Sequence, residues 1–224
     1  MSKVLAYCGY LHRPKISLPA KGVAGAGVQE MAQDNLRVLC SAVKWPLDAP
    51  AMQRHAIEFH DVVNSLFRQT SVAPFDLLTV FASHESLAEF VAQNREAMVA
   101  DLDRLSGCVQ MECVVYAIGS RHEESVGAVR GHPAPSAEAL NQVARHVQQV
   151  RDAVQAFSCE IRVREVKNGS RIFALAQRGE EMRFHEALER LPVTAPVLMR
   201  IKGPRPATEF LSVRLQAPRP EGQP

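Results

Sequence analysis

The sequence predicts an α+β protein built from two domains. Segments with the period-two alternation of strands are interspersed with segments whose apolar residues recur at helical spacing. The length also fits, since 224 residues can form one large domain or two small ones. From Cys108 onward the patterns follow the order β-α-β-β-α-β, which is typical of a ferredoxin-like sheet with both helices on one face.

Residues 1–107 are expected to form the first domain, an N-terminal α+β domain with a mixed α/β sheet. A strand at 4–10 comes first, followed by a hairpin of strands at 28–31 and 36–43 and a helix at 51–68. The run "APFDLLTVFAS" at 73–83 predicts one continuous apolar strand, and Ser83 then caps a long helix. The apolar stripes of the two helices are Ile57, Val62, Val63 and Leu66, then Leu87, Phe90, Val91, Met98, Leu102 and Leu105. Gly107 stands where this second helix should end, so the domain boundary is placed there.

Residues 108–215 are expected to form the C-terminal ferredoxin-like domain. Strands are predicted at 108–116, 159–166, 171–177 and 196–202, with Asn168-Gly169 as a hairpin turn between the second and third. One helix begins after Ser136 and carries the stripe Leu140, Val143, Val147, Val150 and Val154; a shorter one spans 180–191. Residues 216–224 are too polar and proline-rich to fold and are expected to be a disordered tail.

The overall composition excludes several classes of function. Hydrophobic residues make up 46% of the chain, charged residues 22%, and the formal net charge is only +2. A protein that recruits nucleic acid or an acidic membrane by bulk electrostatics usually has a larger basic excess, so neither partner is expected. The N-terminal apolar run is too short for a secretion signal, and no stretch approaches the roughly 18 apolar residues of a spanning helix. We therefore expect a cytoplasmic protein.

A search for catalytic or metal-binding patterns gives little. His55 and His60 lie five apart on a helix and cannot chelate as an i, i+4 pair would, His122 stands in a polar loop, and His185 with Glu189 is interpreted as a solvated pair. Nucleotide-binding and nucleophile motifs fail on sequence or context. The five cysteines form no C-x-x-C pair and are expected to be small buried hydrophobic residues: Cys8, Cys40, Cys108, Cys113 and Cys159. We expect no enzyme, no cofactor and no metal.

A basic strip around the predicted hairpin leaves an RNA-binding sheet to be considered. Its members are Arg162, Arg164, Lys167 and Arg171. The strand at 170–177 carries a single aromatic residue, Phe173, and has Ile172 where the RNA-recognition pattern needs glycine. The strip is therefore interpreted as the solvated face of a sheet.

Two segments resemble one known family. Residues 55–118 are similar to the central block of the gas vesicle GvpL/GvpF proteins, in which a histidine-led helix precedes an apolar strand, a long helix and a second strand. The matching positions are Pro74, Phe75, Thr79, Val80 and Phe81 in the first strand, and Gly107, Val109 and Glu112 around the second. Residues 201–211 look like the C-terminal Gly-Pro-Trp-Pro-Pro-Tyr-Ser-Phe of the family, with matches at Gly203, Pro204, Pro206 and Phe210.

The departures from the family pattern involve both segments. Asp76-Leu77-Leu78 replaces an Arg/Gly-type stretch, while Arg205, Ala207, Thr208 and Glu209 replace Trp, Pro, Tyr and Ser, so that two aromatic residues are lost. The resemblance implies a two-domain protein without catalytic residues, located in the cytoplasm at the gas vesicle. It further implies a structural accessory protein of gas vesicle assembly that binds or chaperones the small hydrophobic shell protein and meets other vesicle accessory proteins. The alternatives are a ferredoxin-like haem or small-molecule oxygenase, and a family relative repurposed as a general interaction module.

The C-terminal motif is the candidate partner contact. Gly203 is expected to make a positive-φ corner, and Pro204 and Pro206 to hold the outgoing chain extended without ladder donors. This stiffening would return the ring of Phe210 onto the C-terminal domain and aim Arg205 outward, where the family carries tryptophan. A strand exit with a packed phenylalanine is the alternative interpretation. The motif residues are thus Gly203, Pro204, Arg205, Pro206 and Phe210.

Overall fold

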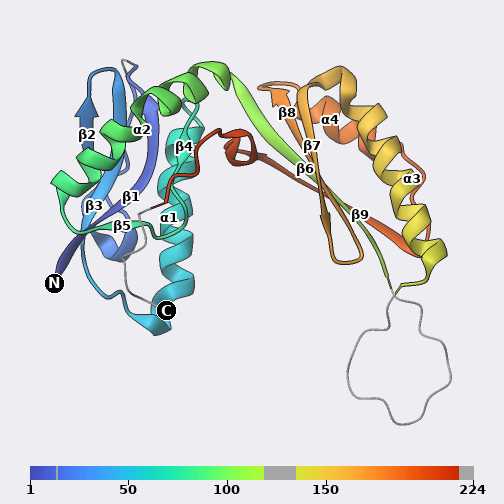
Figure 1. Ribbon diagram of the computed structural model, residues 1–224, viewed down its shortest axis with the longest axis horizontal. Helices are drawn as coiled ribbons and strands as arrows, with labels where there is room; N and C mark the ends of the chain where they lie inside the picture. Colours follow the sequence, from blue (N-terminus) through green and yellow to red (C-terminus); the bar gives the residue numbers. More distant parts are fainter. Residues whose placement is uncertain (14, 119–134, 217–224) are drawn as a thin grey trace, which may run out of the picture. The chain divides into compact units, whose positions relative to one another are not determined.

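The computed structural model describes residues 1–13, 15–118 and 135–216, and its architecture is α+β with two sheets and four α-helices (Figure 1). The chain divides into two compact units. The first unit contains Met1–Gly107 together with the segment from Arg205 onward, and the second contains Cys108–Pro204. The sequence prediction places residues 108–215 in one domain, so the grouping differs for the segment from Arg205 to Leu215.

The sheet of the first unit is built around its first strand. The strands are β1 (Ser2–Leu11), β2 (Gln29–Gln33), β3 (Leu36–Lys44), β4 (Ala73–Pro74) and β5 (Val80–Phe81). They lie in the order β2-β3-β1-β4, β5 also pairs with β1, and the pairings are antiparallel. The predicted hairpin is confirmed: Gln33 faces Leu36, and Asp34 adopts a φ of +53° in the turn.

Two helices cover the two faces of this sheet, which explains why β1 is buried almost throughout. On one side the ring of Tyr7 packs 5.4 Å from that of Phe59 on α1 (Met52–Phe67). On the other, Val4 and Ala6 share a hydrophobic core with the apolar face of α2 (His84–Arg104). Ser83 caps α2 as predicted, and its side chain forms a reciprocal capping box with Ser86.

The prediction of one continuous strand at 73–83 is wrong. The chain pairs with β1 twice, through the two-residue strands β4 and β5, and turns between them. The carbonyl of Asp76 accepts hydrogen bonds from the backbone nitrogen and the hydroxyl of Thr79, at 3.0 and 2.7 Å, and Leu78 adopts a φ of +57°. A polar residue that closes a local turn thus overrides the apolar pattern on either side of it.

The second unit follows the order β-α-β-β-α-β. Its elements are β6 (Cys108–Ala117), α3 (Ala137–Val154), β7 (Ser158–Val166), β8 (Gly169–Gln177), α4 (Glu181–Glu189) and β9 (Val197–Arg205). The strands lie in the order β7-β8-β6-β9, so β7 and β9 are the edges. Figure 1 shows α3 and α4 on the same side of this sheet. Ser136 caps α3 as predicted, accepting a hydrogen bond from the backbone of Ala139.

The predicted hairpin at Asn168-Gly169 forms, but its turn lies one residue earlier than expected. Val166 faces Gly169 across the pair, so the two turn residues are Lys167 and Asn168, and Asn168 has a φ of +63°. Gly169 already belongs to β8, where a Cβ atom would lie 2.2 Å from the carbonyl oxygen of Val115. The glycine is therefore needed for the close approach of β6 rather than for the turn itself.

Several expected core residues lie at the surface. Ile57 is 56% exposed and Leu140 43% exposed, because the buried stripes of α1 and α3 are centred on other residues. The free cysteines Cys8, Cys40, Cys108 and Cys113 are buried as predicted, but Cys159 is exposed on edge strand β7. The loop with His122 and residues 217–224 of the predicted tail lie outside the described residues.

Candidate functional site

The motif begins inside the edge strand β9. This strand runs to Arg205, three residues beyond the predicted end, and Pro204 is tolerated because an edge strand has one side without a ladder partner. Gly203 has a φ of +122°, which confirms the expected positive φ, although the residue lies within the strand and not at its end. A Cβ atom there would lie 2.9 Å from both the carbonyl oxygen of Gln110 and the sulfur of Met111, so the site has room only for glycine.

After Gly203 the chain passes from exposed to buried residues. Pro204 and Arg205 are exposed, whereas Pro206 and Ala207 are buried. A single 3₁₀ turn, Thr208–Phe210, follows and brings the fully buried Phe210 into the structure. The expected burial of the phenylalanine ring is thus confirmed, although the residue is grouped with the first unit and not with the C-terminal domain.

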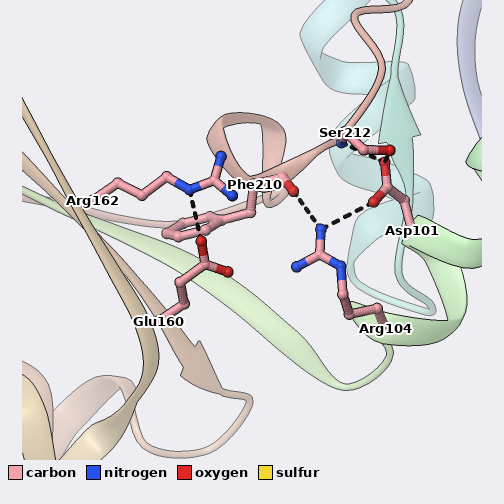
Figure 2. Close-up of polar contacts among 6 residues, drawn as sticks. All are labelled: Asp101, Arg104, Glu160, Arg162, Phe210 and Ser212. Atoms are coloured by element: carbon pink, nitrogen blue, oxygen red, sulfur yellow. Dashed lines mark hydrogen bonds and ion pairs between the residues drawn. The ribbon is translucent and has the colours of Figure 1, made fainter.

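A buried carboxylate anchors the segment that follows. Asp101 on α2 is only 4% exposed, and its Oδ2 atom accepts hydrogen bonds from the backbone nitrogen and the hydroxyl of Ser212, at 2.6 and 2.8 Å. Its Oδ1 atom lies 3.0 Å from a guanidinium nitrogen of Arg104, and the same nitrogen donates to the carbonyl of Phe210 (Figure 2). Two side chains of α2, Asp101 and Arg104, are thereby joined by charge-assisted hydrogen bonds to the chain around Phe210 and Ser212.

A second set of contacts fixes the end of this segment. The backbone nitrogen of Asp76 donates to the carbonyl of Leu215 at 2.7 Å, and Arg214 forms a 3.1 Å ion pair with the Asp76 carboxylate. Leu215 lies in the hydrophobic core of the first unit, with Leu211 and Val213 packed against that core. We call residues 206–215 the C-terminal segment; it is an integral part of the first unit.

Sequence reasoning missed this anchor. Asp101 stands beside Leu102 and three residues after Met98, inside the apolar stripe of α2, where a carboxylate is unfavourable without partners. The place of Asp101 within this apolar stripe was the one feature of the sequence that indicated a buried, partnered carboxylate. Its partners, Arg104 on the same helix and Ser212 111 residues later, could be found only from the fold.

A histidine–carboxylate pair lies elsewhere in the first unit. Nδ1 of the buried His55 donates to Oε2 of Glu58 at 3.0 Å, which is the main reason that the pKa of Glu58 lies below its usual range. The same oxygen accepts from the backbone nitrogen of Ala24 at 2.9 Å, and Ala24 has a φ of +56°. The pair borders an open hollow of about 530 Å³ that Lys44, Asp48 and Arg54 also line. These hydrogen bonds link the Ala24 turn to α1, so the His55–Glu58 pair has a structural role.

Burial makes two of the cysteine thiols less acidic. Burial raises the pKa of the Cys113 thiol to about 12 and that of Cys40 to about 11, which is the opposite of what a nucleophile needs. Within residues 1–13, 15–118 and 135–216, no group of three or more His, Cys, Asp or Glu side chains is placed to hold a metal ion. In that same part of the chain, no helix combines the length and the apolar character needed to cross a membrane.

A comparison with known protein families shows which family the chain belongs to. The family described as "Gas vesicle synthesis protein GvpL/GvpF" matches residues 4–140, more than half of the chain. The chain belongs to the GvpL/GvpF family. The matched range contains the resemblance at residues 55–118, whereas the C-terminal motif lies beyond it.

Solved structures share the fold of this GvpL/GvpF chain. The gas vesicle protein GvpF from Anabaena sp. PCC7120 superposes with a TM-score of 0.76 at 12% identity, covering 97% of this chain and 99% of its own. GvpF from Microcystis aeruginosa gives a TM-score of 0.74 at 15% identity, with coverage of 94% and 99%. At these identities the likeness concerns the fold alone. No curated protein sequence matches the chain.

Proposed function

We propose that this GvpL/GvpF chain is a non-enzymatic accessory protein of gas vesicle assembly that binds the small hydrophobic shell protein in the cytoplasm, at the growing vesicle. The observation that carries the proposal is the family match over residues 4–140. A largely hydrophobic subunit must be shielded before it polymerises, and an accessory protein can do this by offering an exposed surface or a sheet edge.

We further assign the second unit to the ferredoxin-like class and treat the two units as separate domains. The support is the order of elements from β6 to β9 and the order of strands in the sheet, where β8 lies between β6 and β7 and β6 lies between β8 and β9. Such a unit can act as a rigid platform without catalytic groups, because function depends on the residues placed on a fold and not on the fold itself.

The contact proposed for the shell protein is the motif at the end of β9. Gly203 and Pro204 constrain the backbone there, and Arg205, the last residue of β9, is exposed next to the buried Pro206. A strand end with a constrained backbone loses little conformational entropy on binding, which favours it over a flexible loop as a contact. The arginine in place of the tryptophan of the family favours a contact that is partly polar, and it is also the feature that favours a repurposed relative.

The proposal is tested by following aggregation of the shell protein. Light scattering is recorded after the shell protein is diluted from denaturant into buffer containing the parent protein or its Arg205→Ala variant. We expect the parent to delay the rise in scattering and Arg205→Ala to delay it less, while Arg190→Ala, a change at an exposed arginine that follows α4, acts like the parent. If parent and Arg205→Ala are equally protective, the motif is not the contact.

The oxygenase alternative has its own test. Haem or a stoichiometric metal should be visible in the absorbance spectrum and in a metal analysis of the purified protein. A Soret band would favour the oxygenase and count against an accessory role.

A further inference from the structure

The open hollow beside the His55–Glu58 pair lies within the first unit and has the size of a small-molecule site. Its volume is about 530 Å³. Besides the pair itself, its lining includes the apolar residues Ala24, Pro46 and Leu47 and the charged residues Lys44, Asp48 and Arg54. Apolar walls with a few polar groups are typical of sites that hold a small organic molecule.

The ring of His55 has one nitrogen available to a ligand. Because the pKa of Glu58 is lowered, its carboxyl group is ionised at neutral pH and can only accept, so Nδ1 of His55 carries the proton of their hydrogen bond. Among the residues that the structure describes, none forms a hydrogen bond with Nε2. His55 is only 2% exposed, and a buried polar atom without a partner is costly. A ligand in the hollow that His55 lines can supply this partner.

The charges around the hollow favour an anion. The charge of Glu58 is already compensated, since Oε2 accepts from His55 and from the backbone of Ala24, and Oε1 lies 3.7 Å from Nε of Arg54. Lys44 is exposed and forms no ion pair within the described part of the chain. Asp48 is the opposing charge, and removing it provides a test of sign.

The start of α1 adds a second source of positive potential. Arg54 lies in the first turn of this helix, and His55 follows directly. The N-cap position is occupied by Ala51, which has no polar side chain, and the first turn carries no acidic residue. The positive end of the helix dipole is therefore not balanced by a side chain of that turn.

We infer that the hollow binds a small organic anion, with its carboxylate or phosphate group at Nε2 of His55 and its apolar part against Pro46 and Leu47. A neutral imidazole with its proton on Nδ1 has none on Nε2, so the ring takes up a second proton when the anion binds. The charged ring then donates to Glu58 through Nδ1 and to the ligand through Nε2. The inference concerns a small molecule and does not depend on binding of the shell protein, so it can fail separately from the proposed function.

Two other classes of ligand fit the hollow less well. A metal ion could use Nε2, but the described residues place no group of three or more His, Cys, Asp or Glu side chains to hold one. An ammonium group would meet Lys44, Arg54 and the positive end of α1.

The test is isothermal titration calorimetry of the full-length protein with four probes: benzoate, phenyl phosphate, inorganic phosphate and the uncharged benzyl alcohol. We expect benzoate or phenyl phosphate to bind, inorganic phosphate to bind more weakly than phenyl phosphate, and benzyl alcohol not to bind. The tighter of the two aromatic anions identifies the head group. Absence of binding by both aromatic anions would overturn the inference.

Proton uptake shows whether His55 is the contact. At about pH 8 an ordinary histidine is neutral, so benzoate should bind with uptake of a proton, measured from the heats in two buffers of different ionisation enthalpy. Benzoate should also bind more tightly at about pH 6, because ordinary carboxylates, lysines and arginines keep their charges over this range. The charged groups of the lining to which this applies are Glu58, Asp48, Lys44 and Arg54. Binding without proton uptake would contradict the contact at Nε2.

Charge variants at exposed positions test the sign of the ligand. Lys44→Gln should bind benzoate about threefold more weakly and Asp48→Asn about threefold more tightly. The matched controls are Arg68→Gln and Asp61→Asn, which make the same changes of charge at exposed residues outside the lining and should bind like the parent. Opposite signs for Lys44→Gln and Asp48→Asn, or equal effects in the controls, would overturn the inference.

Discussion

At the scale of single residues, Gly203 is the position where backbone geometry constrains the sequence most. Its positive φ disfavours any residue with a side chain, and a Cβ atom there would also press against the Gln110 carbonyl and Met111. Gly25 offers a matched comparison, because it has a φ of +69° but no atom within 4 Å of the position that a Cβ atom would take.

Gly203→Ala is therefore expected to lower the free energy of unfolding by about 3 kcal/mol, from backbone strain and overpacking combined. Gly25→Ala should cost only about 1 kcal/mol, because it adds strain without a clash. Urea denaturation of both variants measures the difference, and equal costs would show that steric contact at Gly203 is unimportant.

Phe210 and Arg205 belong to the same motif, but Phe210 is buried and Arg205 is exposed. Phe210→Ala removes a fully buried ring and should cost about 3 kcal/mol of stability. Arg205→Ala changes an exposed residue and should stay within about 0.5 kcal/mol of the parent in the same urea titration. A large loss for Arg205→Ala would mean that the arginine supports the fold, and a weaker delay of aggregation by this variant would then not indicate a contact.

The lowered pKa of Glu58 predicts that the stability of the folded protein depends on pH. The hydrogen bond from His55 lowers its pKa in the folded state, so the folded protein binds fewer protons than the unfolded chain at that carboxyl group. The resulting stabilisation is present above the ordinary glutamate pKa and is lost as the pH falls through the lowered one. The stability difference between the parent and Glu58→Gln should therefore shrink between about pH 5 and about pH 3. A difference that is constant over this range would contradict the assignment.

At the scale of elements, the C-terminal segment shows how a part late in the sequence completes the first unit. Leu215 enters the core beside β1, β3 and α2, and Asp101 provides the polar anchor. Asp101→Ala should leave the Ser212 amide and the Arg104 guanidinium with fewer partners and cost about 2 kcal/mol.

Hydrogen exchange at the Ser212 amide shows whether the loss of stability arises at the contact with Asp101. In Asp101→Ala the amide of Ser212 should exchange faster than in the parent, because its acceptor is gone. Asp103→Ala removes an exposed carboxylate from the same helix and should leave that rate unchanged. Unaltered exchange at Ser212 in Asp101→Ala would mean that the segment is held without the anchor.

The elements also show what sequence patterns can and cannot specify. Alternation and helical stripes located the long strands and the four α-helices of the described residues, because those periods follow from backbone geometry. The break at Asp76 and the exposure of Ile57 were missed, since a local turn and the direction of packing depend on tertiary contacts. The motif at Gly203 was found from its glycine and prolines, but its anchor on Asp101 required two residues that only the fold brings together.

At the scale of the whole molecule, the chain passes from the first unit to the second at Gly107 and returns at Pro204. The C-terminal motif, which begins at Gly203, lies at this return. Membership of the GvpL/GvpF family assigns the molecule to gas vesicle synthesis, and the proposed binding of the shell protein is the finer claim.

The central claim is tested most directly by capturing the shell protein. The purified full-length chain is immobilised and exposed to the freshly solubilised gas vesicle shell protein from the same organism, with a soluble protein of similar size and charge as the control. The account predicts saturable retention of the shell protein on this chain and none on the control. Equal retention on both, or no retention on this chain under conditions in which it is folded, would contradict the proposal.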